Sequence, residues 1–221
     1  MSVDPLDITN PNAVIAYLRC CAYIAPDEPV RVEVLALSTC NRLVRVERPS
    51  GEAWVLKQAL PRPSAPGGWC SDPGHIGREA EGLRWLPQVA PPGTIAPLVF
   101  EDADRHLIAM AAVPRPHENW KAMLIEGRVD PAHAGQFGAV LATIHRRAAE
   151  WGSPLPEVFA DRSFFEATRL ERYYDHTASR VPDARAFFEA LADESWNRRL
   201  TLVHGDYGPK NLLVLSGDGG Q

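Results

Sequence analysis

A chain of 221 residues is long enough to bury one core of ordinary size, or two small lobes that share a cleft. Apolar residues make up 45% of it, but no apolar run approaches the ~20 residues that a membrane-spanning helix needs. The net charge of −5 offers no basic surface to nucleic acid or to an anionic membrane. We therefore expect a globular protein that binds neither nucleic acid nor a membrane.

The cysteines and the N-terminus point to a reducing compartment. Cys20, Cys21, Cys40 and Cys70 form no Cys-x-x-Cys pattern, and no paired histidine spacing indicates zinc. Residues 1–5 lack the basic start and the apolar stretch of a signal peptide. We expect a cytoplasmic protein with free, buried thiols.

The first half of the chain is rich in strand patterns. Asn10-Pro11 supplies a helix N-cap followed by proline, which predicts a short helix over 13–23. Asp72-Pro73 opens a second helix that runs to Leu86. Five segments have the alternation or β-branched residues of strands: 30–37, 42–48, 53–60, 98–102 and 106–113.

The second half is mainly helical. After the proline-rich residues 114–116, apolar residues recur at helical spacing. The predicted helices span 120–126, 131–150, 164–177 and 183–196. Two short apolar runs near the end, 200–203 and 212–215, are predicted as strands on either side of a polar loop.

Lys57 is the first candidate site residue, because it lies on an otherwise apolar strand. A buried ammonium needs a partner, whereas an exposed edge lysine does not, and both environments are possible here. Glu79 and Glu81 of the following helix point about 200° apart, so only one can face the lysine. Glu79 lies three and four positions from Ile76 and Leu83 on the apolar face. We predict a Lys57–Glu79 pair.

The polar loop 204–211 carries the second set of candidates, His204, Asp206, Lys210 and Asn211. An acid five residues ahead of an amide, between short strands, is the layout of a kinase catalytic loop. There the aspartate accepts the proton of the attacking hydroxyl and the asparagine helps to hold a metal ion. The alternative is a turn in which both side chains only satisfy backbone amides.

In place of the His-Arg-Asp of protein kinases, the loop has His204-Gly205-Asp206, which resembles the aminoglycoside phosphotransferase family of small-molecule kinases. Smaller matches to this family occur in the same order along the chain: Val55-Leu56-Lys57-Gln58, Arg78-Glu79-Ala80-Glu81, Asn119-Trp120-Lys121, Ile144-His145 and Val203-His204-Gly205-Asp206.

The resemblance implies an α+β, bilobal, protein-kinase-like fold. Residues 1–113 would form the N-lobe, with an N-terminal helix, an antiparallel sheet and the Lys57/Glu79 pair. Residues 114–221 would form a mainly helical, incomplete C-lobe that carries the catalytic loop 203–211. The order of strands and helices along the chain agrees with this plan.

The resemblance also implies ATP and Mg²⁺ as cofactors and transfer of the γ-phosphate to a hydroxyl of a small molecule. Asp206 would be the base and Asn211 a metal ligand, while Lys57, oriented by Glu79, would contact the α- and β-phosphates. The family often has a Gly-Gly-x-Ser-Asn turn over the nucleotide. Residues 38–41 contain no glycine, but Ser38 and Thr39 can donate to phosphate oxygens and Asn41 matches the end of that turn.

The sequence departs from the family after the catalytic loop. Family members carry a further metal-binding aspartate in an Ile-Asp-Phe/Trp-Glu segment on the next strand. The chain ends at Gln221 without such a segment, and Asp218 lies in a glycine-rich turn. This departure leaves an alternative function, a catalytically inactive remnant, pseudokinase-like or split, that binds nucleotide or a partner. It also predicts that the strand 212–215 is unpaired on one side.

Overall fold

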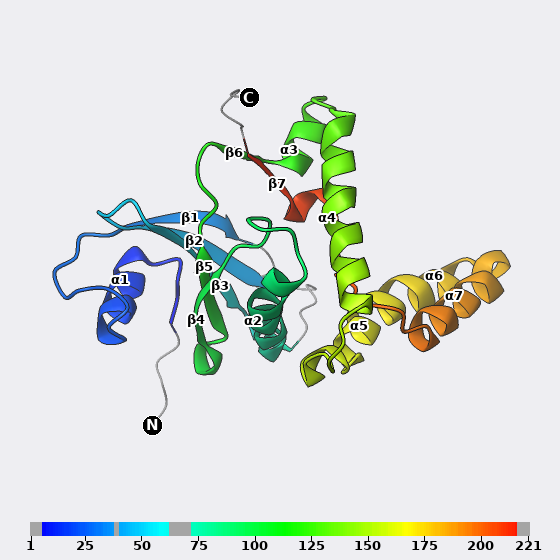
Figure 1. The fold of residues 1–221 in the computed structure, drawn as a ribbon. Coiled ribbons are helices and arrows are strands. Elements are labelled where there is room, and N and C mark those ends of the chain that lie inside the picture. The colour runs from blue at the N-terminus through cyan, green and yellow to red at the C-terminus, as the bar shows by residue number, and fades with distance from the viewer. Residues whose placement is uncertain (1–5, 38–39, 62–71, 216–221) are drawn as a thin grey trace. The chain divides into compact units, whose positions relative to one another are not determined.

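The computed structural model describes residues 6–37, 40–61 and 72–215 (Figure 1). The chain divides into two compact units, which we describe separately. Unit 1 comprises residues up to Pro87 together with Ile95–Ala112, and unit 2 comprises Gln88–Thr94 and the chain from Val113 onward. The division into lobes at residues 113 and 114 stays a prediction.

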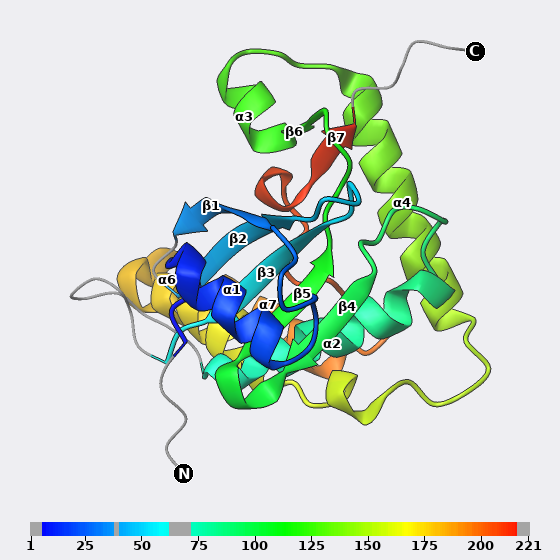
Figure 2. The same ribbon diagram turned by 90° about the vertical axis from the view of Figure 1, so that its left-hand side faces the viewer.

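Unit 1 is built on a five-stranded antiparallel sheet with the order β1-β2-β3-β5-β4, seen face-on in Figure 2. The central strand β3 pairs with β2 on one side and with β5 on the other. The strands are β1 (Arg31–Leu37), β2 (Asn41–Glu47), β3 (Ala53–Ala59), β4 (Leu98–Asp102) and β5 (Leu107–Ala111).

Helix α1 (Pro11–Cys20) covers one face of this sheet. Its first turn is capped by the side chain of Asn10, which accepts from the backbone amides of residues 12 and 13. Val14 and Leu18 pack with Leu107 of β5 in one core cluster, and all three side chains are fully buried. Burial of such side chains is the main stabilising term of a small domain.

Helix α2 (Ile76–Trp85) covers the opposite face (Figure 1). Ile76 and Ala80 form a second cluster with Ile108 and Ala59. Successive residues of a strand point to opposite faces, so Ile108 faces α2 while its neighbours on β5 face α1. The same alternation places Lys57, two residues before Ala59, on the side of α2.

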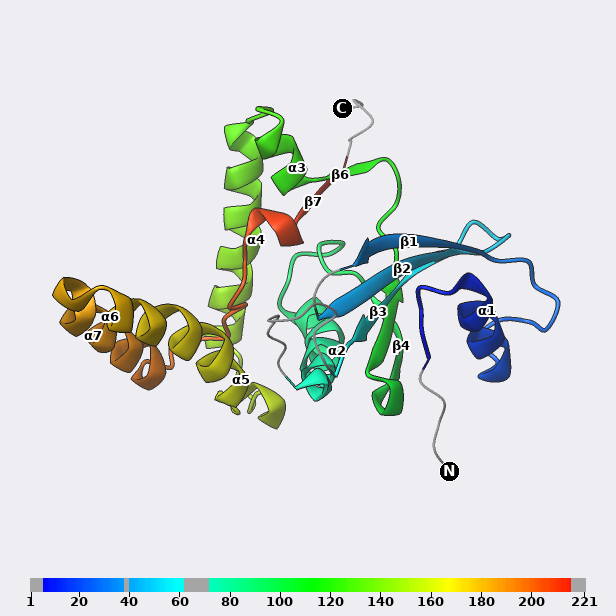
Figure 3. The ribbon, with the colours of Figure 1, turned by 180° about the vertical axis from the view of Figure 1, so that it is seen from behind.

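Unit 2 is mainly helical. Its α- and π-helical elements are α3 (Trp120–Ile125), α4 (Pro131–Ala149), α5 (Ser163–Phe165), the π-helical segment η5 (Glu166–Asp175), α6 (His176–Arg180) and α7 (Arg185–Asn197). Figure 3 shows α6 and α7 side by side. A two-stranded antiparallel sheet joins β6 (His117–Asn119) to β7 (Leu213–Leu215).

Short 3-10 helices connect these elements: η1 (Pro73–His75), η2 (Leu86–Gln88), η3 (Ala103–Arg105), η4 (Glu157–Phe159), η6 (Pro182–Ala184) and η7 (Pro209–Asn211). In the part of the chain that the structure describes, no helix is long and apolar enough to cross a membrane.

The α+β class predicted from the sequence is confirmed, but one predicted strand is absent and one strand was missed. Residues 200–203 form no strand; Leu200 and Val203 are exposed, and the run has no strand beside it among the described residues. The end of the chain pairs instead through β7 with β6, a strand that the sequence analysis missed. The helix expected over 164–177 is present, and Glu166–Asp175 within it is π-helical.

The expectation of free, buried thiols is also wrong. Cys20 and Cys21 are free but exposed, because they lie at the end of α1 beyond its buried face. Cys40 is disulfide-bonded. Cys70 lies outside the described residues.

Candidate active site

The predicted Lys57–Glu79 pair is present in unit 1. Lys57 lies in the middle of β3, opposite Leu43 of β2 and Ile108 of β5, and Glu79 lies in the first turn of α2. The lysine Nζ and the glutamate Oε2 are 2.5 Å apart. Glu81 pairs instead with Arg84 of its own helix. Glu79 holds the Lys57 ammonium in place. The side chain of Lys57 is 21% exposed, so the ammonium remains accessible to a ligand.

The predicted nucleotide contacts between β1 and β2 are only partly described. Ser38 and Thr39 lie outside the described residues. Asn41 begins β2, where its backbone lies opposite Ala59 at the end of β3. Asn41 and Lys57 therefore belong to the same sheet, on neighbouring strands.

The catalytic-loop candidates lie in unit 2, on a turn that requires glycine. Gly205 has a φ of +75°, in the left-handed region that side chains with a Cβ rarely adopt. A Cβ added at this position would have Phe165 Cδ2 as its nearest neighbour, at 3.9 Å, so backbone conformation and not space selects glycine here. The turn lets the backbone N–H of Asp206 donate to His204 Nδ1 at 3.1 Å.

Three polar contacts fasten the loop and the segment just before it to the surrounding helices. The Tyr207 hydroxyl donates to the carbonyl of Phe137 in α4 at 2.8 Å, and the Thr201 hydroxyl donates to the carbonyl of His145 at 2.7 Å. Arg169 of η5 donates from Nε to the carbonyl of Gly205. The loop is thus held by specific hydrogen bonds, each of which constrains the position of Asp206.

Asp206 is surrounded by hydrogen-bond donors. Lys210 Nζ lies 2.8 Å and Asn211 Nδ2 lies 3.2 Å from Oδ2, and Arg169 Nη2 lies 3.4 Å from Oδ1. Partial burial opposes ionisation, but the hydrogen bonds from Lys210 and Asn211 and the charges of Arg169 and Lys210 outweigh it. The pKa of the Asp206 carboxyl is therefore lowered. The group is a carboxylate at neutral pH.

Asn211 has a defined orientation. Its Nδ2 donates both to the Asp206 backbone carbonyl, at 2.9 Å, and to the Asp206 carboxylate. Because the amide nitrogen is committed to Asp206, the amide oxygen points away from it. The structure thus brings Asp206 and Asn211 together, as the sequence predicted, with carboxylate and amide oxygens on one short loop.

Such oxygens suit a hard cation. Within the described residues, no three His, Cys, Asp or Glu side chains gather into a metal cluster. Side chains of the described ranges therefore do not by themselves form a cage of the kind that holds Ca²⁺ or Zn²⁺. The amide oxygen of Asn211 fits Mg²⁺, which keeps several waters and takes further ligands from substrate phosphates.

Two contributors to this site were missed as such by the sequence analysis. Arg169 lies 37 residues before Asp206, and nothing local to it indicates the contact. Asn119 was part of a short family match, but its role follows only from the structure. Its Oδ1 caps α3 by accepting from the backbone of Lys121 at 3.1 Å, and its Nδ2 donates to the carbonyl of Lys210 at 2.9 Å.

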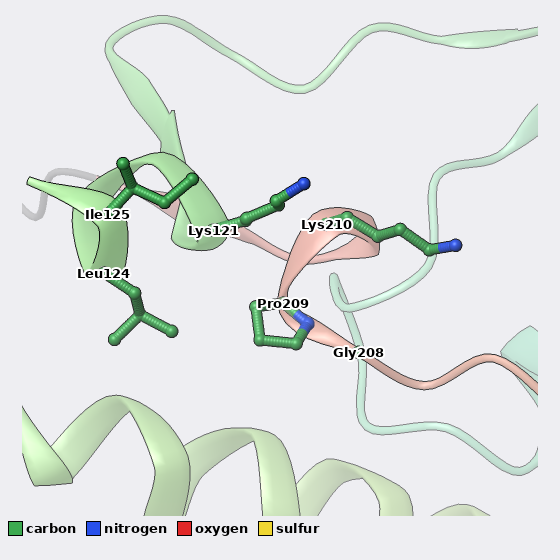
Figure 4. A pocket seen from close by; sticks show the side chains of 6 residues that line it. All are labelled: Lys121, Leu124, Ile125, Gly208, Pro209 and Lys210. Carbon is green, nitrogen blue, oxygen red and sulfur yellow. The ribbon is translucent and has the colours of Figure 1, made fainter. Parts of the chain in front are cut away.

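The chain contains few lysines, and all of them lie in the segments described above. Among 23 basic residues there are three lysines, Lys57, Lys121 and Lys210. Lys57 forms the pair with Glu79, and Lys210 contacts Asp206. Lys121 and Lys210 also line a cavity of unit 2 with a volume of about 460 Å³ (Figure 4).

Comparison with known proteins bears on this arrangement. The sequence matches the model of the APH phosphotransferase enzyme family over residues 32–221. Among solved structures, the chain is similar to that of a candidate fructosamine-3-kinase from Thermobifida fusca YX-ER1, with 23% identity and a TM-score of 0.48. The similarity covers 85% of this chain but only 64% of that protein. No curated protein matches the chain.

Proposed function

Because the chain belongs to the APH phosphotransferase enzyme family, we propose that it transfers the γ-phosphate of ATP, with Mg²⁺, to a hydroxyl of a small molecule. The observation that carries the proposal is the Lys57–Glu79 pair at 2.5 Å. A lysine clamped by a helix glutamate is the arrangement that protein kinases use on nucleotide phosphates.

Each unit has its own task in this proposal. Residues 1–113 bind the nucleotide, and Lys57 contacts its α- and β-phosphates while Glu79 keeps the ammonium in place. Ser38, Thr39 and Asn41 supply further polar contacts to the phosphates. Residues 114–221 carry the catalytic loop and the acceptor.

Asp206 acts on the acceptor hydroxyl. Its lowered pKa keeps the carboxylate ionised at neutral pH, so that it can orient the hydroxyl and accept the proton. A carboxylate with a low pKa is a weak base, which suits a reaction in which bond breaking to the leaving group runs ahead of proton transfer. Asn211 offers its amide oxygen as a metal ligand. When bound, Mg²⁺ would neutralise charge on the phosphates.

The proposal is tested by Asp206→Asn in the 221-residue chain. ADP formation is measured with ATP, Mg²⁺ and a panel of small hydroxylated compounds. Loss of the base should lower turnover by about 10²–10⁴-fold. The matched control is Asp183→Asn, which neutralises an exposed acid of the same unit and should leave turnover unchanged.

Two other results are informative. Unchanged ADP formation in Asp206→Asn would contradict the assignment of the base. Weak, magnesium-independent nucleotide binding without any ADP formation by the unaltered chain would favour the alternative function, a catalytically inactive nucleotide-binding or partner-binding protein.

A further inference from the structure

Unit 2 contains a cavity beside the catalytic loop that none of the roles above uses. It lies between α3 and the turn η7, and its volume is about 460 Å³, within the range of small-molecule sites. Its lining residues are Lys121, Leu124, Ile125, Gly208, Pro209 and Lys210. Figure 4 shows both lysine side chains extending to the same side, away from Leu124 and Ile125.

The charge of this cavity has one sign. Two of its six lining residues are lysines and none is acidic. Lys210 shares its ammonium with Asp206. Lys121 has no ion-pair partner within the described ranges. Ammonium groups at one side of a cavity whose other side is apolar make an environment that attracts an anion bearing a carbon skeleton.

The cavity is tied to Asp206 by a short chain of contacts. Lys210 Nζ is 2.8 Å from the Asp206 carboxylate, so the cavity wall and the base are adjacent. Asn119 joins the two sides of the cavity, because its side chain binds the backbone of Lys121 and the backbone of Lys210. The two lysines are therefore held on a common, fixed frame.

We propose that this cavity is the acceptor subsite and that the acceptor carries an anionic group, a carboxylate or a phosphate, which binds between Lys121 and Lys210. The inference rests on the proposed function, since it identifies the substrate class of the same site. The apolar side chains of Leu124 and Pro209 contact the carbon skeleton. Polycations are excluded by repulsion from the two ammonium groups.

The test compares gluconate, an anion, with sorbitol, a neutral polyol of similar size, and with kanamycin, a larger polycation. Calorimetry measures their binding to the 221-residue chain. Gluconate should bind at least about tenfold more tightly than the other two, and its affinity should fall with ionic strength.

Variants assign this binding to the cavity. Lys121→Gln should weaken gluconate binding about five- to tenfold, and Lys121→Arg should restore most of it. Arg146→Gln, which removes an exposed cation from α4, is the matched control and should have no effect. Binding of a fluorescent ATP analogue to Lys121→Gln tells whether the anion belongs to the acceptor or to the nucleotide, and should be unchanged.

The outcomes separate this inference from the proposed function. Equal affinity for gluconate and sorbitol, insensitivity to Lys121→Gln, or weakened binding of the ATP analogue would each overturn the acceptor subsite. ADP formation with sorbitol or kanamycin, unaffected by Lys121→Gln, would overturn it while leaving phosphotransfer intact. Lys121-dependent gluconate binding without ADP formation would support the anion site and contradict the proposed function.

Discussion

The two units differ in how far their apolar side chains are buried. The largest fully buried side chains lie in unit 1, with Val89 as the exception, and they form clusters on both faces of the sheet. Most of the exposed large apolar side chains in the described part of the chain lie in unit 2: Ile125, Val129, Tyr173, Val181, Phe187, Leu200, Val203, Leu213 and Leu215.

The difference extends to the candidate site residues. Lys57 and Glu79 stand on a strand and a helix that are anchored by burial. Asp206 stands on a loop whose position depends on single hydrogen bonds, such as that from Tyr207 to α4. Elements with few buried apolar contacts open locally at low free-energy cost. We therefore expect the lysine clamp to be rigid and the catalytic loop to respond to point mutations.

The largest expected effect is a difference in stability between two leucine-to-alanine variants, one in each unit. Leu56→Ala removes a fully buried side chain of β3 and should lower the free energy of unfolding by about 2–5 kcal/mol. Leu200→Ala, at a residue 69% exposed, should change it by less than about 0.5 kcal/mol. Urea denaturation measures both. Similar losses from the two substitutions would contradict the contrast between the units.

A smaller effect is expected at the glycine of the catalytic loop. Gly205→Ala puts a Cβ on a residue with a φ of +75° and should destabilise unit 2 by about 1–2 kcal/mol. Gly208→Ala is the matched control, because its φ of −134° suits any residue and no atom lies within 4 Å of the added Cβ. Thermal unfolding distinguishes them. If both variants unfold like the unaltered chain, the turn does not constrain the loop.

The stability of unit 1 should depend on pH in the alkaline range. Burial, and then the hydrogen bond to Asp102 and its charge, raise the pKa of Tyr17. The stabilisation is therefore present below the unfolded-state pKa of about 10 and is lost as the pH rises above it. Tyr17→Phe should cost about 1 kcal/mol at neutral pH and should flatten the alkaline slope. Urea titrations at about pH 7 and above about pH 10 measure this; an unchanged slope would contradict it.

The smallest expected effect is the loss of stability of unit 2 at acidic pH. Asp206 has a lowered pKa, so its stabilising contacts are present above the unfolded-state pKa of about 3.9 and are lost as the pH falls below it. Its side chain is 40% exposed, so solvent screening limits the contribution to less than about 1 kcal/mol. Asp206→Asn should remove this part of the acid slope. A steeper slope in the variant would show that Asp206 is not stabilised by its neighbours.

Sequence patterns were sufficient where the signal is local. The Lys57–Glu79 contact followed from a lysine on an apolar strand and from the apolar face of a helix, and both signals lie within a few residues of the side chains concerned. The Asp206–Asn211 contact was predictable for the same reason, because five residues of one turn separate the two.

Sequence patterns failed where an element depends on partners that are distant in the sequence. Residues 200–203 have the composition of a strand, but a strand forms only beside another, and none of the described strands lies there. Conversely, β6 is three residues long and exists because β7 pairs with it. Arg169 reaches the catalytic loop from a helix, and Asn119 reaches it from β6, which pairs with β7 just after the loop. Both contacts join residues far apart in the sequence, so no local pattern predicts them.

The scarcity of lysine has a practical consequence. A protease that cuts only after lysine can cleave this chain at three points, in β3, in α3 and directly before Asn211. Each bond becomes a substrate only when its own element opens. The three cleavage rates would therefore report separately on the lysine clamp, on the wall of the cavity and on the catalytic loop, and a ligand that protects one of them would reveal where it binds.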